Sequence, residues 1–177
     1  MRAGKNSQNI AIKGVFVKVL FSIFSPMKAE HINPFLKSTI ETFKTMVGLT
    51  VTPGKLYLRK EPGNSDISGV IGLSGDIRGA VVMAYPLDTA IKLSSKFMGE
   101  EIKELNAAVA DCIGELANII TGFAKKDLQS LHLSISLPSI VRGQNHVVDM
   151  PKDAPVMCIP FESEMGGFIM EISMVDK

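Results

Sequence analysis

Residues 105–128 read LNAAVADCIGELANIITGFAKKDL, and this stretch decides the fold. Apolar residues recur along it every three or four positions, which is the pattern of a helix with one side packed into a core. These residues are Leu105, Val109, Cys112, Leu116, Ile119, Ile120 and Phe123. We therefore predict a long helix from Leu105 to Leu128 whose apolar side faces the interior of the protein.

A second side of this predicted helix carries a narrow polar stripe. At about 100° per residue, four positions line up roughly 120° away from the apolar side. They are Asp111, Glu115, Asn118 and Gly122. A solvated helix surface usually carries long Lys, Glu and Gln side chains, whereas the neighbours of this stripe are short. The pattern predicts that another molecule approaches the stripe closely.

The spacing Asp111-x-x-x-Glu115-x-x-Asn118 is followed by Pro138, twenty residues after the asparagine. This pattern resembles the signature of the CheC/CheX/FliY phosphatases of bacterial chemotaxis. Three other stretches are similar to the same family, at residues 33–48, 68–86 and 164–174. The resemblance covers about Met27 to Val175. The proline lies slightly nearer to the asparagine than in the CheC branch, so we expect a different loop after the helix.

The resemblance implies a protein phosphatase that hydrolyses the aspartyl phosphate of a phosphorylated CheY-type response regulator. Asn118 would orient the attacking water, since an amide both donates and accepts hydrogen bonds. Glu115, the second residue of the catalytic pair, would also bind a lysine of the regulator. Asp111 and Gly122 are further candidates for the partner-binding surface, although Asp111 could instead stabilise the N-terminal half of the helix electrostatically. No cofactor of its own is implied, because the regulator would carry the Mg²⁺.

A second hypothesis is a non-catalytic binding module of the same fold that docks a response regulator or a signalling enzyme. The intact Asn118 favours the phosphatase, because a module without activity would not need a water-orienting amide at this position.

The composition argues against several other functions. Nineteen basic and eighteen acidic residues give a net charge of +1, without the clustered Lys and Arg that nucleic-acid binding requires. His31, His132 and His146 are scattered and form no metal-binding motif. Cys112 and Cys158 lie in apolar surroundings, so we expect buried thiols in a reducing cytoplasm rather than a disulfide.

Turn-forming residues divide the rest of the chain into an α+β domain. Helices are predicted at residues 33–47 and 86–98, and strands at 55–60, 67–74, 78–85, 131–141, 155–161 and 167–174. Together with the long helix, these give a mainly antiparallel sheet of about six strands with three helices packed on it. We expect this domain to span residues 27–177, after an N-terminal tail of residues 1–26. The apolar run in the tail is far shorter than the roughly 20 residues of a membrane span.

A faint internal repeat indicates a pseudo-symmetric, CheC-like fold. Lys37, Glu41, Lys44 and Gly48 have the same spacing as the four residues of the polar stripe. Lys44 replaces the asparagine in this copy, so a single intact motif remains, as in the CheX branch of the family. We therefore expect no active site at Lys44.

Finally, we expect a homodimer. The resemblance to CheX implies dimers joined through their sheets. The apolar stretch from Val81 to Tyr85 contains no charge or proline that would protect an exposed strand edge. Pairing of this strand with a second copy would satisfy its backbone groups in a two-fold arrangement that leaves the Asn118 stripe free.

Overall fold

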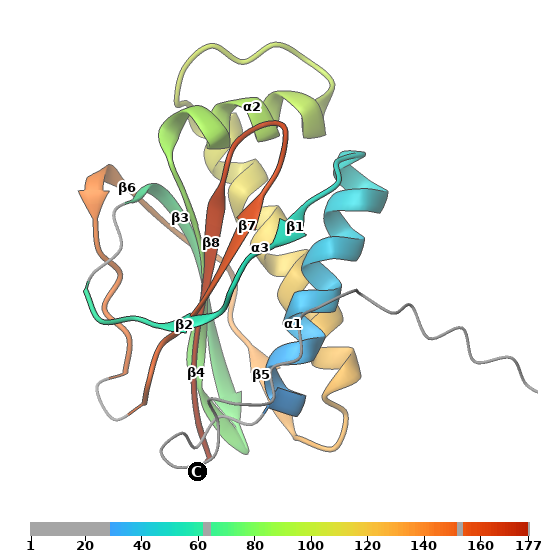
Figure 1. Ribbon diagram of the computed structural model, residues 1–177, viewed down its shortest axis with the longest axis vertical. Coiled ribbons are helices and arrows are strands. Elements are labelled where there is room, and N and C mark those ends of the chain that lie inside the picture. The colour runs from blue at the N-terminus through green and yellow to red at the C-terminus, as the bar shows by residue number, and fades with distance from the viewer. Residues whose placement is uncertain (1–28, 62–64, 152–153, 177) are drawn as a thin grey trace, which may run out of the picture.

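Three α-helices pack on one face of a single eight-stranded antiparallel sheet (Figure 1). This computed structural model describes residues 29–61, 65–151 and 154–176. The expected tail, residues 1–26, lies outside the described residues. The arrangement confirms the predicted α+β fold class.

The helices are α1 (Ala29–Thr42), which a π-helical turn, η1 (Phe43–Val47), continues, then α2 (Leu87–Met98) and α3 (Ala107–Asp127). The strands are β1 (Thr52–Pro53), β2 (Tyr57–Leu58), β3 (Ser65–Gly75), β4 (Ile77–Tyr85), β5 (Leu133–Ile135), β6 (Ser139–His146), β7 (Met157–Glu162) and β8 (Phe168–Asp176).

The strand count exceeds the predicted number because one predicted strand is divided in two and one further short strand was not predicted. Residues 131–141 form two strands, β5 and β6, on either side of Pro138, which lacks the N–H that a sheet ladder needs. The region before β3 contains two short strands, β1 and β2, instead of one continuous strand at 55–60.

The order of the strands contradicts the expected edge at Val81 to Tyr85. The sheet runs β1-β7-β8-β4-β3-β5, with β2 also on β7 and β6 also on β3. Strand β4 is therefore interior, and Val81 lies between Ile71 of β3 and Ile172 of β8. A run of apolar residues without charges suits such a position, because β3 and β8 pair with both edges of β4 and leave no open edge that charges would have to protect. The edges of the described sheet are β1 and β2 on one side and β5 and β6 on the other.

The core forms between the helices and one face of the sheet. Its centre is Phe168, whose ring stacks on Phe43, Tyr85 and Phe161 at centroid distances of 4.9, 5.1 and 5.1 Å. These rings come from η1, β4, β7 and β8, so the cluster joins segments that are far apart in the sequence. Alternate residues of β3, β4 and β8 point to the opposite face of the sheet.

The long helix was predicted correctly, but its buried side is wider than expected. Helix α3 begins at Ala107, because the side chain of Asn106 accepts a hydrogen bond from the Val109 N–H at 3.1 Å and caps the first turn. Phe123, expected in the core, is 43% exposed. Residues such as Ile113 are buried instead, because α3 packs against α1 and α2 as well as against the sheet.

The other two helices differ from the prediction mainly at one boundary. Helix α1 starts at Ala29 rather than Asn33, so Pro34 lies inside it. The predicted stops are confirmed, since Gly48 and Gly99 both adopt the left-handed conformation, with φ of 67° and 73°.

Replacing Gly69 with alanine should destabilise the protein by about 1–3 kcal/mol. A Cβ atom at this position would lie 3.0 Å from both the Cβ of Ala117 and the carbonyl oxygen of Ile113, where α3 crosses β3. Gly122→Ala is the matched control, because a Cβ there meets no atom within 4 Å and alanine favours a helix by about 0.5–1 kcal/mol. Urea unfolding measures both; equal stabilities would contradict this packing.

Candidate functional site

The structure brings the four residues of the polar stripe together on the outer side of α3. Asp111 and Glu115 are exposed, and Asn118 and Gly122 are partly buried. Within the described residues, none of the three polar side chains makes a hydrogen bond or ion pair, and the space beside Gly122 is open. Along the stripe, the unpaired carboxylates of Asp111 and Glu115 come first. The unpaired carboxamide of Asn118 follows, and then Gly122, which has free space beside it.

The opposite side of α3 holds the stripe in this orientation. Leu116 and Ile120 are completely buried, and Cys112 is 4% exposed. Burial raises the pKa of the Cys112 thiol, which marks its surroundings as apolar. Since this side is fixed against the sheet and the other helices, the stripe must point away from the core.

Pro138 lies against α3 at Gly114. An added Cβ on Gly114 would lie 3.2 Å from the Ile140 Cδ1 and 3.6 Å from the Pro138 Cβ. The glycine lets the β5–β6 connection lie directly against the helix, one residue before Glu115. Gly114 was not among the predicted site residues, although a glycine inside a helical pattern is a signal of close packing.

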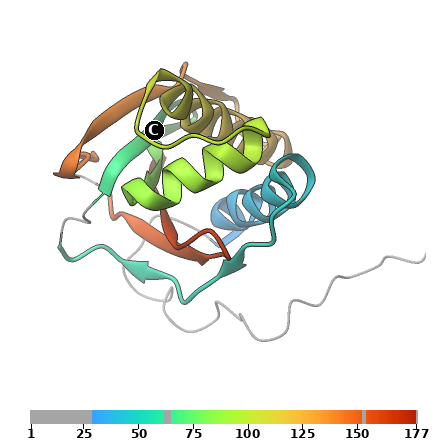
Figure 2. The same cartoon turned by 90° about the horizontal axis from the view of Figure 1, so that it is seen from above.

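The degenerate repeat begins on α1, which packs against α3 (Figure 2), and continues through η1 to Gly48. Its members Glu41, Lys44 and Gly48 are all exposed. Lys37 forms an ion pair with Asp127 at the end of α3, with 3.0 Å between Nζ and Oδ2. This pair and the hydrogen bond within it raise the pKa of the lysine. The two helices of the repeat are therefore neighbours, and the α1 copy offers no amide.

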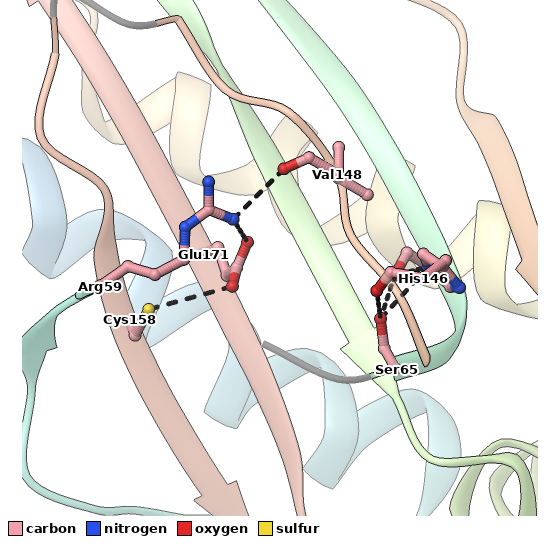
Figure 3. A network of polar contacts seen from close by, with 7 residues as sticks. Arg59, Ser65, His146, Val148, Cys158 and Glu171 are labelled. Carbon is pink, nitrogen blue, oxygen red and sulfur yellow. Dashed lines mark hydrogen bonds and ion pairs between the residues drawn. The ribbon is translucent and has the colours of Figure 1, made fainter. Parts of the chain in front are cut away.

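A second polar cluster lies on the sheet face opposite the helices (Figure 3). Arg59 Nη1 is 2.9 Å from Glu171 Oε2 and donates a hydrogen bond to the Val148 carbonyl oxygen at 3.2 Å. Burial raises the pKa of Glu171, and the Arg59 guanidinium opposes this shift. Cys158, 4.0 Å from Glu171, has a pKa raised by burial to about 11. Both cysteines are free and buried, as predicted.

His146 completes this cluster beside a cavity of about 270 Å³. Its Nδ1 lies 2.8 Å from the Gly143 carbonyl oxygen, which can only accept a hydrogen bond. Nδ1 is therefore the donor, and Nε2 is the ring nitrogen that accepts a hydrogen bond. Ser68, which is fully buried, donates to Nε2 at 2.8 Å, and Ser65 lies 3.2 Å from the same atom. The polar side chains of this network form hydrogen bonds with neighbouring groups, whereas those of the stripe on α3 have no such partner among the described residues. The sequence does not reveal this network, because its members come from separate strands and loops.

Two further properties bear on the kind of site. Among the described residues, no group of three or more His, Cys, Asp or Glu side chains could hold a metal ion. In the same part of the chain, one helix has the length and composition of a membrane span, namely α3, with a mean hydropathy of 1.3. It is the central helix of the core, which accounts for its apolar character.

The fold is that of the CheC-like chemotaxis proteins. The model of the family described as chemotaxis phosphatase CheX matches residues 67–162. The chain belongs to the CheX family, which confirms the resemblance seen in the sequence.

Known relatives agree with this assignment. The CheY-P phosphatase CheX of Thermotoga maritima is 31% identical over 124 residues, which cover 67% of this chain and 79% of the relative. The crystal structure of the chemotaxis protein CheX from Vibrio vulnificus is 31% identical, with a TM-score of 0.78 over 83% of this chain and 100% of that chain. The CheX–CheY–BeF₃–Mg²⁺ complex from Borrelia burgdorferi shares the fold, with 24% identity and a TM-score of 0.73 over 82% of this chain and 98% of that chain.

Arg59→Ala should lower the free energy of unfolding by about 3 kcal/mol, because it leaves the Glu171 carboxylate buried without a counter-charge. Glu171 would respond with a higher folded-state pKa. A carboxyl group whose pKa is higher in the folded than in the unfolded state loses stability as the pH rises through that interval. The loss should therefore be larger at pH 8 than at pH 5 in urea unfolding.

Lys37→Ala is the control, because its ion pair with Asp127 is exposed, with side-chain exposures of 59% and 48%. It should leave the melting temperature almost unchanged. If the two variants lost similar stability at both pH values, the buried Arg59–Glu171 pair would not contribute more than the exposed Lys37–Asp127 pair, and the prediction would be wrong.

Proposed function

We propose that this chain is a protein phosphatase that hydrolyses the aspartyl phosphate of a phosphorylated CheY-type response regulator. One observation carries the proposal: the amide of Asn118 stands unpaired on the open side of α3, three residues after the free carboxylate of Glu115. Membership of the CheX family and the name of the Thermotoga maritima relative, CheY-P phosphatase, support the same reaction.

Asn118 would orient the water that attacks the phosphorus. Its Oδ1 can accept a hydrogen bond from the water, and its Nδ2 can donate one to an oxygen nearby. Attack forms a new P–O bond and breaks the bond to the aspartyl oxygen, which leaves as a carboxylate, so the products are inorganic phosphate and the free aspartate. An amide cannot remove the proton at neutral pH, and the rate gain would come from positioning the water.

Glu115, Asp111 and Gly122 would form the surface on which the regulator docks. The Glu115 carboxylate is available to a lysine of the regulator, and this contact would hold Asn118 at the phosphoryl group. An ion pair at the rim of an interface contributes under about 1 kcal/mol, whereas one desolvated by docking contributes more. Gly122 would let the partner backbone approach, since no side chain occupies the space beside it.

The regulator would bring the Mg²⁺ that the reaction needs, and the chain would require no cofactor of its own. This division is supported by the complex from Borrelia burgdorferi, which combines CheX with CheY, BeF₃ and Mg²⁺. In phosphoryl transfer, the metal ion neutralises charge on the phosphoryl oxygens.

We further propose a cytoplasmic homodimer. Buried free thiols at Cys112 and Cys158 suit a reducing compartment. Because β4 is interior, a sheet-to-sheet dimer has to use an edge strand, and β6 offers eight residues against two each in β1 and β2. The polar stripe would remain outside such an interface.

Asn118→Ala should reduce the accelerated dephosphorylation by about 100-fold or more while leaving the fold intact, because only the positioned water is lost. Phosphate release from an acetyl-phosphate-charged regulator measures the effect. Lys44→Ala, at the equivalent position of the degenerate copy in η1, should retain wild-type activity. Near-full activity of Asn118→Ala, or an equal loss in Lys44→Ala, would contradict the assignment.

Glu115→Ala should raise the regulator concentration needed for the half-maximal rate by about 3- to 30-fold, because a docking contact is removed. The matched control is Glu41→Ala, which removes the equivalent exposed carboxylate from α1. The same titration compares the two, and a concentration dependence unchanged from the wild type would remove Glu115 from the docking surface.

Light scattering at micromolar concentration should give a mass close to twice the 19.1 kDa of one chain. A mass of one chain at every concentration tested would end the dimer proposal while leaving the phosphatase proposal intact.

A further inference from the structure

Leu137 is by far the most exposed large apolar side chain among the described residues. It is 86% exposed, whereas the other exposed large apolar side chains of that part of the chain lie between 41% and 45%. Single exposed leucines are common on protein surfaces and need no special explanation. What distinguishes Leu137 is the support of its backbone and its place in a segment that packs on α3 next to Glu115.

The backbone around Leu137 is held firmly although its side chain makes little contact. Ser136 donates its N–H to the Gly72 carbonyl oxygen, and its Oγ accepts from the Gly72 N–H, both at 2.9 Å. The same Oγ donates to the Leu137 carbonyl oxygen at 2.7 Å. The following residue, Pro138, has a fixed φ angle. Leu137 is thus anchored to β3 on one side and to a rigid proline on the other.

This anchored segment lies directly along α3. Pro138 and Ile140 pack against Gly114, which precedes Glu115 by one residue and Asn118 by one helical turn. A protein that docks on Glu115 therefore reaches the segment that carries Leu137. An apolar residue with a fixed backbone loses little conformational freedom on docking, which favours its use as an anchor.

We propose that Leu137 is a docking residue for the phosphorylated response regulator, and that it packs against an apolar patch beside the regulator's phosphorylation site. The inference rests on the proposed function. It assigns the two parts of the surface different tasks: Leu137 sets the affinity for the regulator, and Asn118 acts on the phosphoryl group.

The test is a titration of phosphate release against the concentration of acetyl-phosphate-charged regulator. Leu137→Ala should raise the half-maximal concentration by about 10-fold and leave the maximal rate within about 2-fold, because ground-state and transition-state binding weaken together. Leu137→Asp should weaken binding further, and Leu137→Met should largely restore it. The melting temperatures should not change, since the side chain is solvated.

Leu58→Ala is the matched control, because Leu58 is also exposed but lies on β2, at the other edge of the sheet. It should titrate like the wild type. An unchanged half-maximal concentration in Leu137→Ala, an equal shift in Leu58→Ala, or a fall confined to the maximal rate would overturn the inference. Light scattering could also show that Leu137→Ala lowers the mass of the assembly in solution while regulator binding is unchanged. This result would overturn the inference, because Leu137 would then serve a contact between copies of this chain.

A direct binding measurement separates this inference from the proposed function. The regulator treated with BeF₃⁻ and Mg²⁺ is used as a stable probe that cannot turn over. If the wild type binds this probe without accelerating phosphate release, the phosphatase proposal fails, and a 10-fold weaker binding of Leu137→Ala still upholds Leu137 as a docking residue. Equal binding of wild type and variant would overturn it whatever the catalytic result.

Discussion

The close contact between α3 and β3 at Gly69 determines how the functional surface is presented. With only hydrogen on its Cα, Gly69 lets the helix approach until an added Cβ would lie 3.0 Å from the Ile113 carbonyl oxygen and the Ala117 Cβ. Contact at this distance fixes the rotation of α3 about its own axis, because interiors are close-packed and a turned helix would leave voids. With that rotation fixed, the stripe that contains Asn118 can face only outward.

The two polar regions of the molecule differ in how far their groups are satisfied. On the open face of the sheet, Arg59, Glu171 and His146 bond with one another or with neighbouring groups, as buried polar atoms must. On α3, the polar side chains of the stripe have no partner within the described residues. The first arrangement stabilises the fold, and the second leaves the Asn118 amide free to bind another group.

The sequence predicted the features that depend on local patterns. Helical periodicity gave α3 and the outward side of Asn118, and the left-handed glycines at positions 48 and 99 gave the ends of two helical segments. Features that depend on distant segments were missed. The apolar run of β4 did not reveal that β3 and β8 lie on either side of it, so an interior strand was taken for an edge. Phe123 has helical spacing, but its burial depends on which elements reach the end of α3. Leu137 gave no signal at all, because its exposure depends on the hydrogen bonds between Ser136 and Gly72.

The central claim is that the surface of α3 catalyses hydrolysis rather than only binding a regulator. The most direct measurement is the release of phosphate from a phosphorylated CheY-type regulator in large excess over this chain. A phosphatase should release many phosphates per chain, at an initial rate proportional to the amount of chain added. Release at the regulator's own rate, unaffected by added chain even where binding is observed, would show a binding module and contradict the account.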